Sequence, residues 1–217
     1  KMKNSNDSLA DLVTCFRGFP IQRAINERGH YPVIGGTNVK RYGIEGVKGF
    51  LTKSEYASLG QKIDKIAQPK LMAQNLVAHI QNPTPHIQII ATFDESGKIM
   101  NLDTVTNIVP EAQKVCPKFL LALLNSTLVS WYAYKFIFCS AIRTMHLDKY
   151  YVGKIPIPAV LPEQQIPVQR LVERILSAKQ HDAQADTSAL EREIDQLVYG
   201  LYGLTPEEIE IVEGTVR

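Results

Sequence analysis

A 16-residue stretch without a charged side chain, FLLALLNSTLVSWYAY (residues 119–134), indicates where the core of this protein lies. Its leucines, together with Trp131 and Tyr132, recur at spacings of three and four residues, which produces one wide apolar face on a helix. The stretch is shorter than the roughly 20 residues that a membrane-spanning helix needs, and polar residues occupy its middle. We therefore expect a buried core helix that begins at Pro117 and ends near Phe136.

The residues before this helix predict a small twisted sheet. Residues 86–93, HIQIIATF, alternate and are rich in β-branched side chains, which is typical of a strand. We also expect strands at residues 31–34, 47–51 and 70–80 and, after the turn DESGK at 94–98, within 99–103 and 104–109. A sheet combined with a buried helix predicts a mixed α+β fold class.

The residues after the helix predict a separate helical segment. The proline-rich stretch VGKIPIPAVLP, residues 152–162, is incompatible with a regular helix. We place a domain boundary there, with a body at residues 1–160 and a helical spacer at 161–217. Three helices are expected in the spacer, the first two paired as a hairpin around residues 181–187. Capping boxes at Ser188–Glu191 and Thr205–Glu208 would start the second and third helices.

Charge is distributed unevenly between these two parts. Residues 1–160 hold 19 Lys and Arg against 11 Asp and Glu, whereas residues 161–217 hold 5 against 11. A basic body with an acidic tail suggests a polyanionic partner for the body. A mixed, solvated surface with chance clustering explains the same numbers equally well.

The stretch PVIGGTNVKRYGI, residues 32–44, combines two glycines with polar and basic residues. It lacks both the GxxxxGK[ST] pattern of a P-loop and the GxGxxG pattern of a dinucleotide site, so a phosphate cradle of either kind is not expected. Arginine can bind a phosphate or a guanine edge through two hydrogen bonds, and asparagine can do the same for adenine. The stretch is either a nucleic-acid contact or a solvated turn.

Catalytic and metal-binding patterns are absent from the sequence. NPTP, residues 82–85, lacks the second proline and the aromatic residue of the NPPY motif of amino-methyltransferases, and no PD…(D/E)xK nuclease arrangement occurs. Cys139 and His146 could act as nucleophile and base, although a cysteine in an aromatic-rich segment more often packs in a core. Three widely spaced cysteines and scattered histidines predict neither a disulfide framework nor a metal site. The cysteines favour a reducing, cytoplasmic setting. The shortness of the apolar stretch favours a protein without a membrane anchor.

Several segments taken in order resemble one known family. These are PVIGGTNVKRYGI, PKLMAQNL, ATFDESGKIMNLDTVTNIV, KFLLALLNSTLVSWYAYKF, KIPIP, PEQQIPVQRLVERIL and LEREIDQLVYGLYGLTPEEIEIVE. Together they resemble the TaqI-like C-terminal specificity domain of type IIG restriction–modification enzymes and phage-defence adenine methyltransferases, which is similar in layout to a target-recognition half of a type I specificity subunit.

The resemblance implies a non-catalytic domain that reads a short sequence in double-stranded DNA. It also implies a catalytic partner, either an N-terminal methyltransferase or nuclease domain of the same protein or a separate subunit. S-adenosylmethionine and possibly Mg²⁺ would be bound there, and no cofactor is expected in this chain. A protein-interaction module and a degenerate nuclease or methyltransferase are the alternatives. The candidate DNA contacts are Arg17, Arg23, Thr37, Asn38, Lys40, Arg41, Tyr42, Lys70, Arg143, His146 and Lys149.

Overall fold

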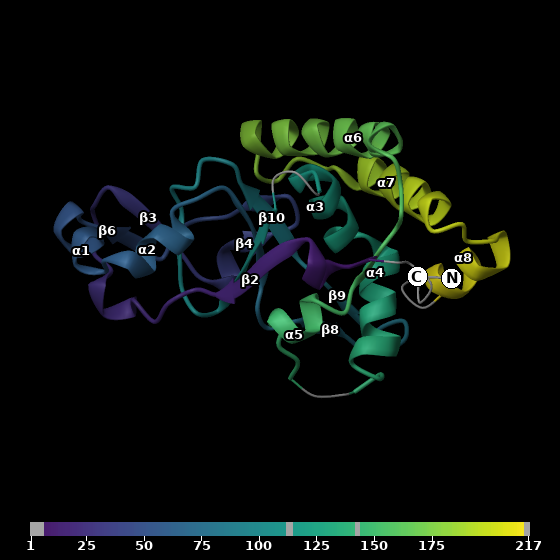
Figure 1. Ribbon diagram of the computed structural model, residues 1–217, viewed down its shortest axis with the longest axis horizontal. Coiled ribbons are helices and arrows are strands. Elements are labelled where there is room, and N and C mark those ends of the chain that lie inside the picture. The colour runs from purple at the N-terminus through teal and green to yellow at the C-terminus, as the bar shows by residue number, and fades with distance from the viewer. Residues whose placement is uncertain (1–6, 112–114, 142–143, 215–217) are drawn as a thin grey trace.

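The structure is a computed structural model that describes residues 7–111, 115–141 and 144–214 (Figure 1). It combines helices with several small sheets, which confirms the predicted mixed α+β class. Among the described residues, no helix has both the length and the apolar character that crossing a membrane requires.

The apolar stretch of the core forms two α-helices instead of one. These are α3 (Pro117–Asn125) and α4 (Thr127–Tyr132), and one π-helical turn (Ala133–Ile137) continues α4. The prediction of burial is confirmed, because every residue of α3 from Phe119 to Asn125 is buried. The prediction of one continuous helix is wrong.

The helix breaks at Ser126 because polar side chains there hold other parts of the fold. Ser126 is extended (φ −68°, ψ 148°) and its hydroxyl accepts a hydrogen bond from Val129 N, which caps α4. The side chain of Asn125 accepts a bond from Ala91 N and donates one to Ala91 O, both at 3.0 Å. An unbroken helix would have to give up this arrangement.

The largest sheet has four strands: β2 (Val13–Arg17), β7 (Lys70–Gln74), β10 (Ala91–Asp94) and β12 (Val105–Pro110). They are antiparallel in the order β10-β7-β12-β2, and α3 packs against β7 and β10 on one face. Alternation along β2 directs Val13, Cys15 and Arg17 to one face, where Val13 and Cys15 are buried.

Two of the predicted strands are divided in the structure. Residues 70–80 form β7 and β8 (Ala78–Ile80), and residues 86–93 form β9 (His86–Gln88) and β10. β8 and β9 pair as a hairpin. Ile89 N, between β9 and β10, donates to Ser130 Oγ of α4, so the backbone leaves the hairpin there and crosses to the four-stranded sheet.

A smaller lobe lies at one end of the molecule (Figure 1, left). Its sheet contains β3 (Tyr31–Ile34), β6 (Gly49–Leu51) and β11 (Met100–Asn101), with β3 in the middle, antiparallel to β6 and parallel to β11. Helices α1 (Lys53–Ser58) and α2 (Gln61–Ile66) belong to this lobe. A separate apolar cluster that includes Val33, Leu51, Ile66 and Met100 forms its core.

Short elements complete the part of the body that the structure describes. Hairpin strands β4 (Val39–Lys40) and β5 (Gly43–Ile44) pair with each other, as do β1 (Asp7–Ser8) and β13 (Pro156–Ile157). Helix α5 spans Lys149–Val152, and 3₁₀ turns occupy Leu9–Asp11, Gln22–Ala24 and Gly36–Asn38.

Three C-terminal helices are present as predicted: α6 (Pro162–His181), α7 (Ser188–Leu201) and α8 (Pro206–Glu213). Thr205 and Glu208 form the expected capping box. The capping box predicted at Ser188–Glu191 is not formed: Thr187 is the N-cap of α7 and makes no side-chain cap bond, and its hydroxyl donates instead to the Glu191 side chain at Oε1, at 2.8 Å. Helix α6 packs on α3, and α7 and α8 contact α4, so these helices share the main core. The division at residue 160 remains a prediction.

Candidate nucleic-acid interface

The turn at Asp103 and Thr104, between β11 and β12, lies where the two sheets meet. Arg17 Nε and Nη2 both donate to the Asp103 carbonyl oxygen, at 2.9 and 2.7 Å. Thr104 Oγ1 accepts a bond from Gly36 N at 2.9 Å, and its carbonyl accepts one from Asn75 N at 3.0 Å. This turn therefore connects three segments: the end of β2, the turn at residues 35–38, which we call the glycine turn, and the segment after β7.

The glycine turn approaches the Asp103–Thr104 turn closely because Gly35 and Gly36 lack side chains. A Cβ atom on Gly36 would lie 2.7 Å from the Thr104 carbonyl oxygen, and one on Gly35 would lie 3.2 Å from Cε of Lys48. Gly35 and Gly36 thus have a packing role. Their position brings exposed Thr37 and Lys48 beside the turn.

A buried asparagine holds His146 on the other side of the turn. Thr106 Oγ1 donates to the Leu147 carbonyl oxygen at 2.6 Å, so it must accept the 2.9 Å bond from Asn75 Nδ2. Oδ1 of Asn75 then faces His146 Nδ1 at 2.7 Å, and Nδ1 carries the hydrogen. His146 is exposed, and its Nε2 makes no hydrogen bond within the part of the chain that the structure describes.

Lys149 lies on the same face of the sheet as Arg17. It begins α5, which packs against β2. Burial raises the pKa of the Cys15 thiol to about 12. The Asp148 carboxylate adds to this rise and the Lys149 ammonium opposes it, so both charged groups lie close enough to Cys15, in the middle of β2, to affect its pKa. Since Cys15 and Arg17 are two residues apart on one face, about 7 Å separates their positions along the strand.

The structure thus gathers exposed side chains from five segments around one turn. We call this set the Asp103 surface, and it consists of Arg17, Thr37, Leu76, Thr104, His146 and Lys149. Arg23 and Lys48 are also exposed and border the surface, because Gln22 Nε2 bonds Asp103 Oδ1 at 3.3 Å and Lys48 adjoins Gly35. Cations with free donors next to polar and apolar groups can bind phosphates and touch base edges.

Leu76 and Thr104 belong to this surface and Lys48 borders it, but none of the three was among the sequence candidates. Leu76 was assigned to a strand in which an apolar residue is expected to be buried, and it is 54% exposed. Lys48 lies in a segment with no distinctive motif. These residues are recognised only from the contacts that the Asp103–Thr104 turn makes with segments far away in the sequence.

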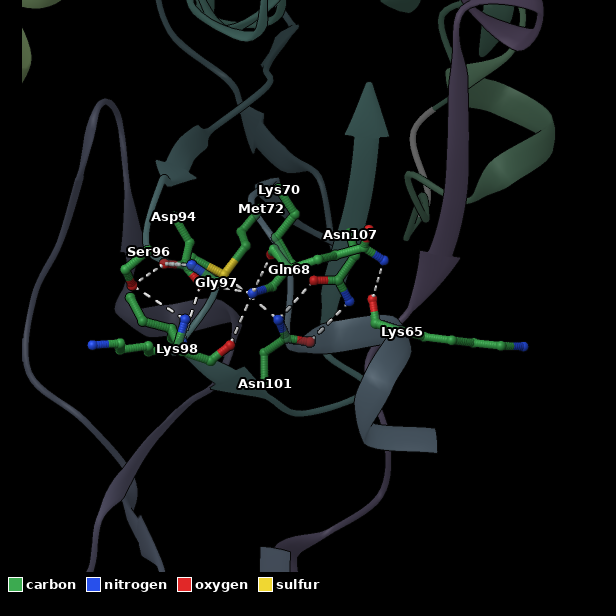
Figure 2. A network of polar contacts seen from close by, with 11 residues as sticks. Lys65, Gln68, Lys70, Met72, Asp94, Ser96, Gly97, Lys98, Asn101 and Asn107 are labelled. Atoms are coloured by element: carbon green, nitrogen blue, oxygen red, sulfur yellow. Dashed lines mark hydrogen bonds and ion pairs between the residues drawn. The ribbon is translucent and has the colours of Figure 1, made fainter. Parts of the chain in front are cut away.

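Lys70, in contrast, is located on the opposite face of the sheet and is fully buried (Figure 2). Its ammonium donates to Asp94 Oδ2 at 2.7 Å and to the Ile99 carbonyl oxygen at 3.0 Å. Burial lowers the pKa of Lys70, and the hydrogen bond to Asp94 opposes that shift. Lys70 therefore stabilises the 94–99 turn, and we remove it from the candidate DNA contacts.

Two asparagines of the same polar network hold the two strands that lead into the Asp103–Thr104 turn. Asn101 and Asn107 exchange amide hydrogen bonds at 2.7 and 2.9 Å, and both side chains are fully buried (Figure 2). Because these residues flank the turn in β11 and β12, their pairing fixes the separation of the two strands that lead into it.

Arg41 and Tyr42 have roles within the fold as well. Arg41 Nε donates to Glu191 Oε2 of α7 and Nη1 donates to the Asn125 carbonyl oxygen, both at 2.7 Å. Tyr42 is only 2% exposed, and burial raises the pKa of its hydroxyl. The Tyr42 side chain is not accessible to a nucleic acid in this structure, and the Arg41 side chain, which is 23% exposed, is held by Glu191 and Asn125. Neither is retained among the candidates.

Three sequence candidates remain: Asn38, Lys40 and Arg143. Asn38 closes its own turn, accepting from Gly35 N and donating to the Glu45 carbonyl oxygen. Lys40 is exposed and lies 3.5 Å from Glu45. Arg143 lies outside the described residues. Within the described ranges, no group of three or more His, Cys, Asp or Glu side chains is arranged to hold a metal ion.

Comparison with protein families gives a match over the central part of the chain. A family model described as the TaqI-like C-terminal specificity domain matches residues 31–157 of the chain. A search of curated proteins found no match. The matched range includes every member of the Asp103 surface except Arg17.

Proposed function

The chain belongs to the family of TaqI-like C-terminal specificity domains, and on this basis we propose that it recognises a short sequence in double-stranded DNA through the Asp103 surface. The family match carries the proposal. The surface supports it, because Arg17 is far in sequence from His146 and Lys149 and yet the three residues come from segments that pack together next to one turn.

The contacts of Arg17 suit this role. Two of its five N–H donors hold the Asp103 carbonyl oxygen, which fixes the plane of the guanidinium group. The other three donors make no bond to the residues that the structure describes, and the side chain is exposed. A guanidinium held in this way can present a bidentate edge to a phosphate or to guanine.

The proposed partner is a catalytic domain that methylates or cleaves the DNA that this chain selects. Its family is one of specificity domains, so we assign the chemistry, S-adenosylmethionine and any Mg²⁺ to that partner. If this assignment holds, the chain by itself will neither methylate nor cleave a selected duplex when both cofactors are supplied.

The test is selection from a randomised duplex library at two salt concentrations, followed by affinity measurements on the selected sequence. We expect one short motif to be enriched. Because each phosphate contact releases counterions, Arg17→Ala and Lys149→Ala should each reduce the slope of log K against log salt by about 1. Arg192, an exposed arginine of α7, provides the matched control, and Arg192→Ala should leave the slope unchanged.

Three outcomes are informative. Enrichment of a motif with reduced slopes in both variants supports the proposal. Salt-dependent binding without a motif would contradict sequence recognition by this chain alone. Failure to bind at low salt would favour a protein-interaction module.

A further inference from the structure

Leu76 is an exposed leucine fixed in the middle of the Asp103 surface. Its neighbours are held on both sides: Asn75 N donates to the Thr104 carbonyl oxygen and Val77 N to the Met145 carbonyl oxygen, each at 3.0 Å. Leu147 N donates to the Asn75 carbonyl oxygen at 2.7 Å. The backbone therefore cannot turn Leu76 inward without breaking several bonds, and its side chain stays 54% exposed.

His146 lies directly across from Leu76. The two residues form an antiparallel β-bridge, and residues opposed in this way have Cα atoms about 5 Å apart. Because Nδ1 of His146 donates to Asn75, the tautomer with its hydrogen on Nδ1 offers the lone pair of Nε2 as a hydrogen-bond acceptor. The chain thus presents a methyl-rich side chain next to a single oriented acceptor.

From this pairing we propose that Leu76 and His146 read one A·T base pair in the major groove, with Leu76 against the thymine methyl group and His146 Nε2 accepting from the adenine 6-amino group. The proposal rests on the proposed function. The major-groove edge of an A·T pair displays a donor on adenine and a methyl group on thymine, which are complementary to these two side chains. No other Watson–Crick pair has a methyl group there.

The surroundings favour a nucleic acid over a protein as the partner of Leu76. Arg17 pairs with Thr106 in the sheet, and the hydroxyl of Thr106 accepts the hydrogen bond of the asparagine that holds His146. Leu76 is therefore an exposed apolar side chain on a surface that also carries cationic ones. Protein interfaces more often have a larger apolar centre with fewer charges, whereas base-reading surfaces combine phosphate contacts with single apolar contacts to thymine.

The test uses the duplex motif obtained by selection and replaces each thymine in turn by deoxyuridine, which removes only the methyl group. At one position the wild-type chain should bind the deoxyuridine duplex about fourfold more weakly, which corresponds to the loss of one buried methyl group. Leu76→Ala should bind the two duplexes equally. A second arm replaces the paired adenine by 2-aminopurine, which moves the amino group out of the major groove, and His146→Ala should be insensitive to that change.

Leu161→Ala is the control, since Leu161 is a comparably exposed leucine at the start of α6 and the variant should keep the full response to deoxyuridine. If no thymine position shows a response that depends on Leu76, the inference is wrong even though the motif stands. If the selection enriches no motif, the proposed function itself fails.

Discussion

At the scale of single residues, Lys70 and Asp94 show how a buried charge is tolerated in this fold. Both side chains are at most 1% exposed, and removing charges from water is costly unless every donor and acceptor is satisfied. Asp94 accepts bonds from Ser96 Oγ, Gly97 N and Ile99 N in addition to that from Lys70. Lys70 has no other carboxylate partner among the described residues. Lys70 therefore depends on Asp94 more than Asp94 depends on Lys70.

We expect Asp94→Ala to destabilise the protein more than Lys70→Met. Asp94→Ala leaves a buried ammonium without its counter-charge and removes the acceptor of the 94–99 turn, so a loss of about 3–5 kcal/mol is expected. Lys70→Met keeps the volume and leaves Asp94 its three other donors, so the loss should be at most about half as large. Urea unfolding of both variants measures the difference, and equal losses would contradict this account of the pair.

At the scale of elements, the glycine turn illustrates how close packing positions the proposed interface. Gly36 does not have a positive φ, so its backbone conformation is open to other residues; the constraint is the Thr104 carbonyl oxygen, 2.7 Å from where a Cβ would lie. A side chain can be accommodated only if the 36–38 turn and the Asp103–Thr104 turn move apart.

Gly36→Ala should consequently destabilise the protein by about 1–3 kcal/mol, the usual cost of overpacking, and weaken DNA binding. Gly200 in α7 is the matched control because no atom lies within 4 Å of its Cβ position, so Gly200→Ala should be neutral or stabilising by up to about 1 kcal/mol. Thermal unfolding and DNA affinity of both variants provide the measurement. An unchanged stability for Gly36→Ala would show that the two turns separate easily.

The elements also show what the sequence predicted well and what it did not. The buried core helix and the three C-terminal helices follow from apolar periodicity and capping residues, which are local signals. The break at Ser126 was missed because the bonds of Asn125 to Ala91 are made across the fold. The roles of Lys70 and Arg41 were missed for a similar reason, since a basic residue in a sequence gives no indication of a carboxylate that lies 24 or 150 positions away.

At the scale of the whole molecule, the C-terminal helices are joined to the body by polar contacts as well as by their apolar faces. Arg41 reaches Glu191, and Thr127 donates through both its amide and its hydroxyl to Asp195. Burial raises the pKa of the Asp195 carboxyl, opposed by these hydrogen bonds and by the charge of Arg41. The body and the proposed spacer therefore share partly buried charges next to α4.

These shared contacts predict that the chain unfolds in one cooperative step. Trp131, the only tryptophan, lies in α4 against the C-terminal helices, and its fluorescence should change at the same urea concentration as the far-ultraviolet circular dichroism. Arg41→Ala should lower both midpoints together. Two separated transitions would instead show that residues 161–217 form an independent unit.

The hydrogen bond between Arg41 and Glu191 has a consequence for synthesis of the protein in the cell. The two residues are 150 positions apart, and ribosomes add about 5–20 residues per second. Arg41 is therefore added to the chain roughly 8–30 s before its partner. Helix α3 is completed partway through that interval, and 56 residues separate its end at Asn125 from the end of α6 at His181. For about 3–11 s the apolar face of α3 that α6 later covers is therefore exposed on the nascent chain, so molecular chaperones that bind apolar segments have time to engage it.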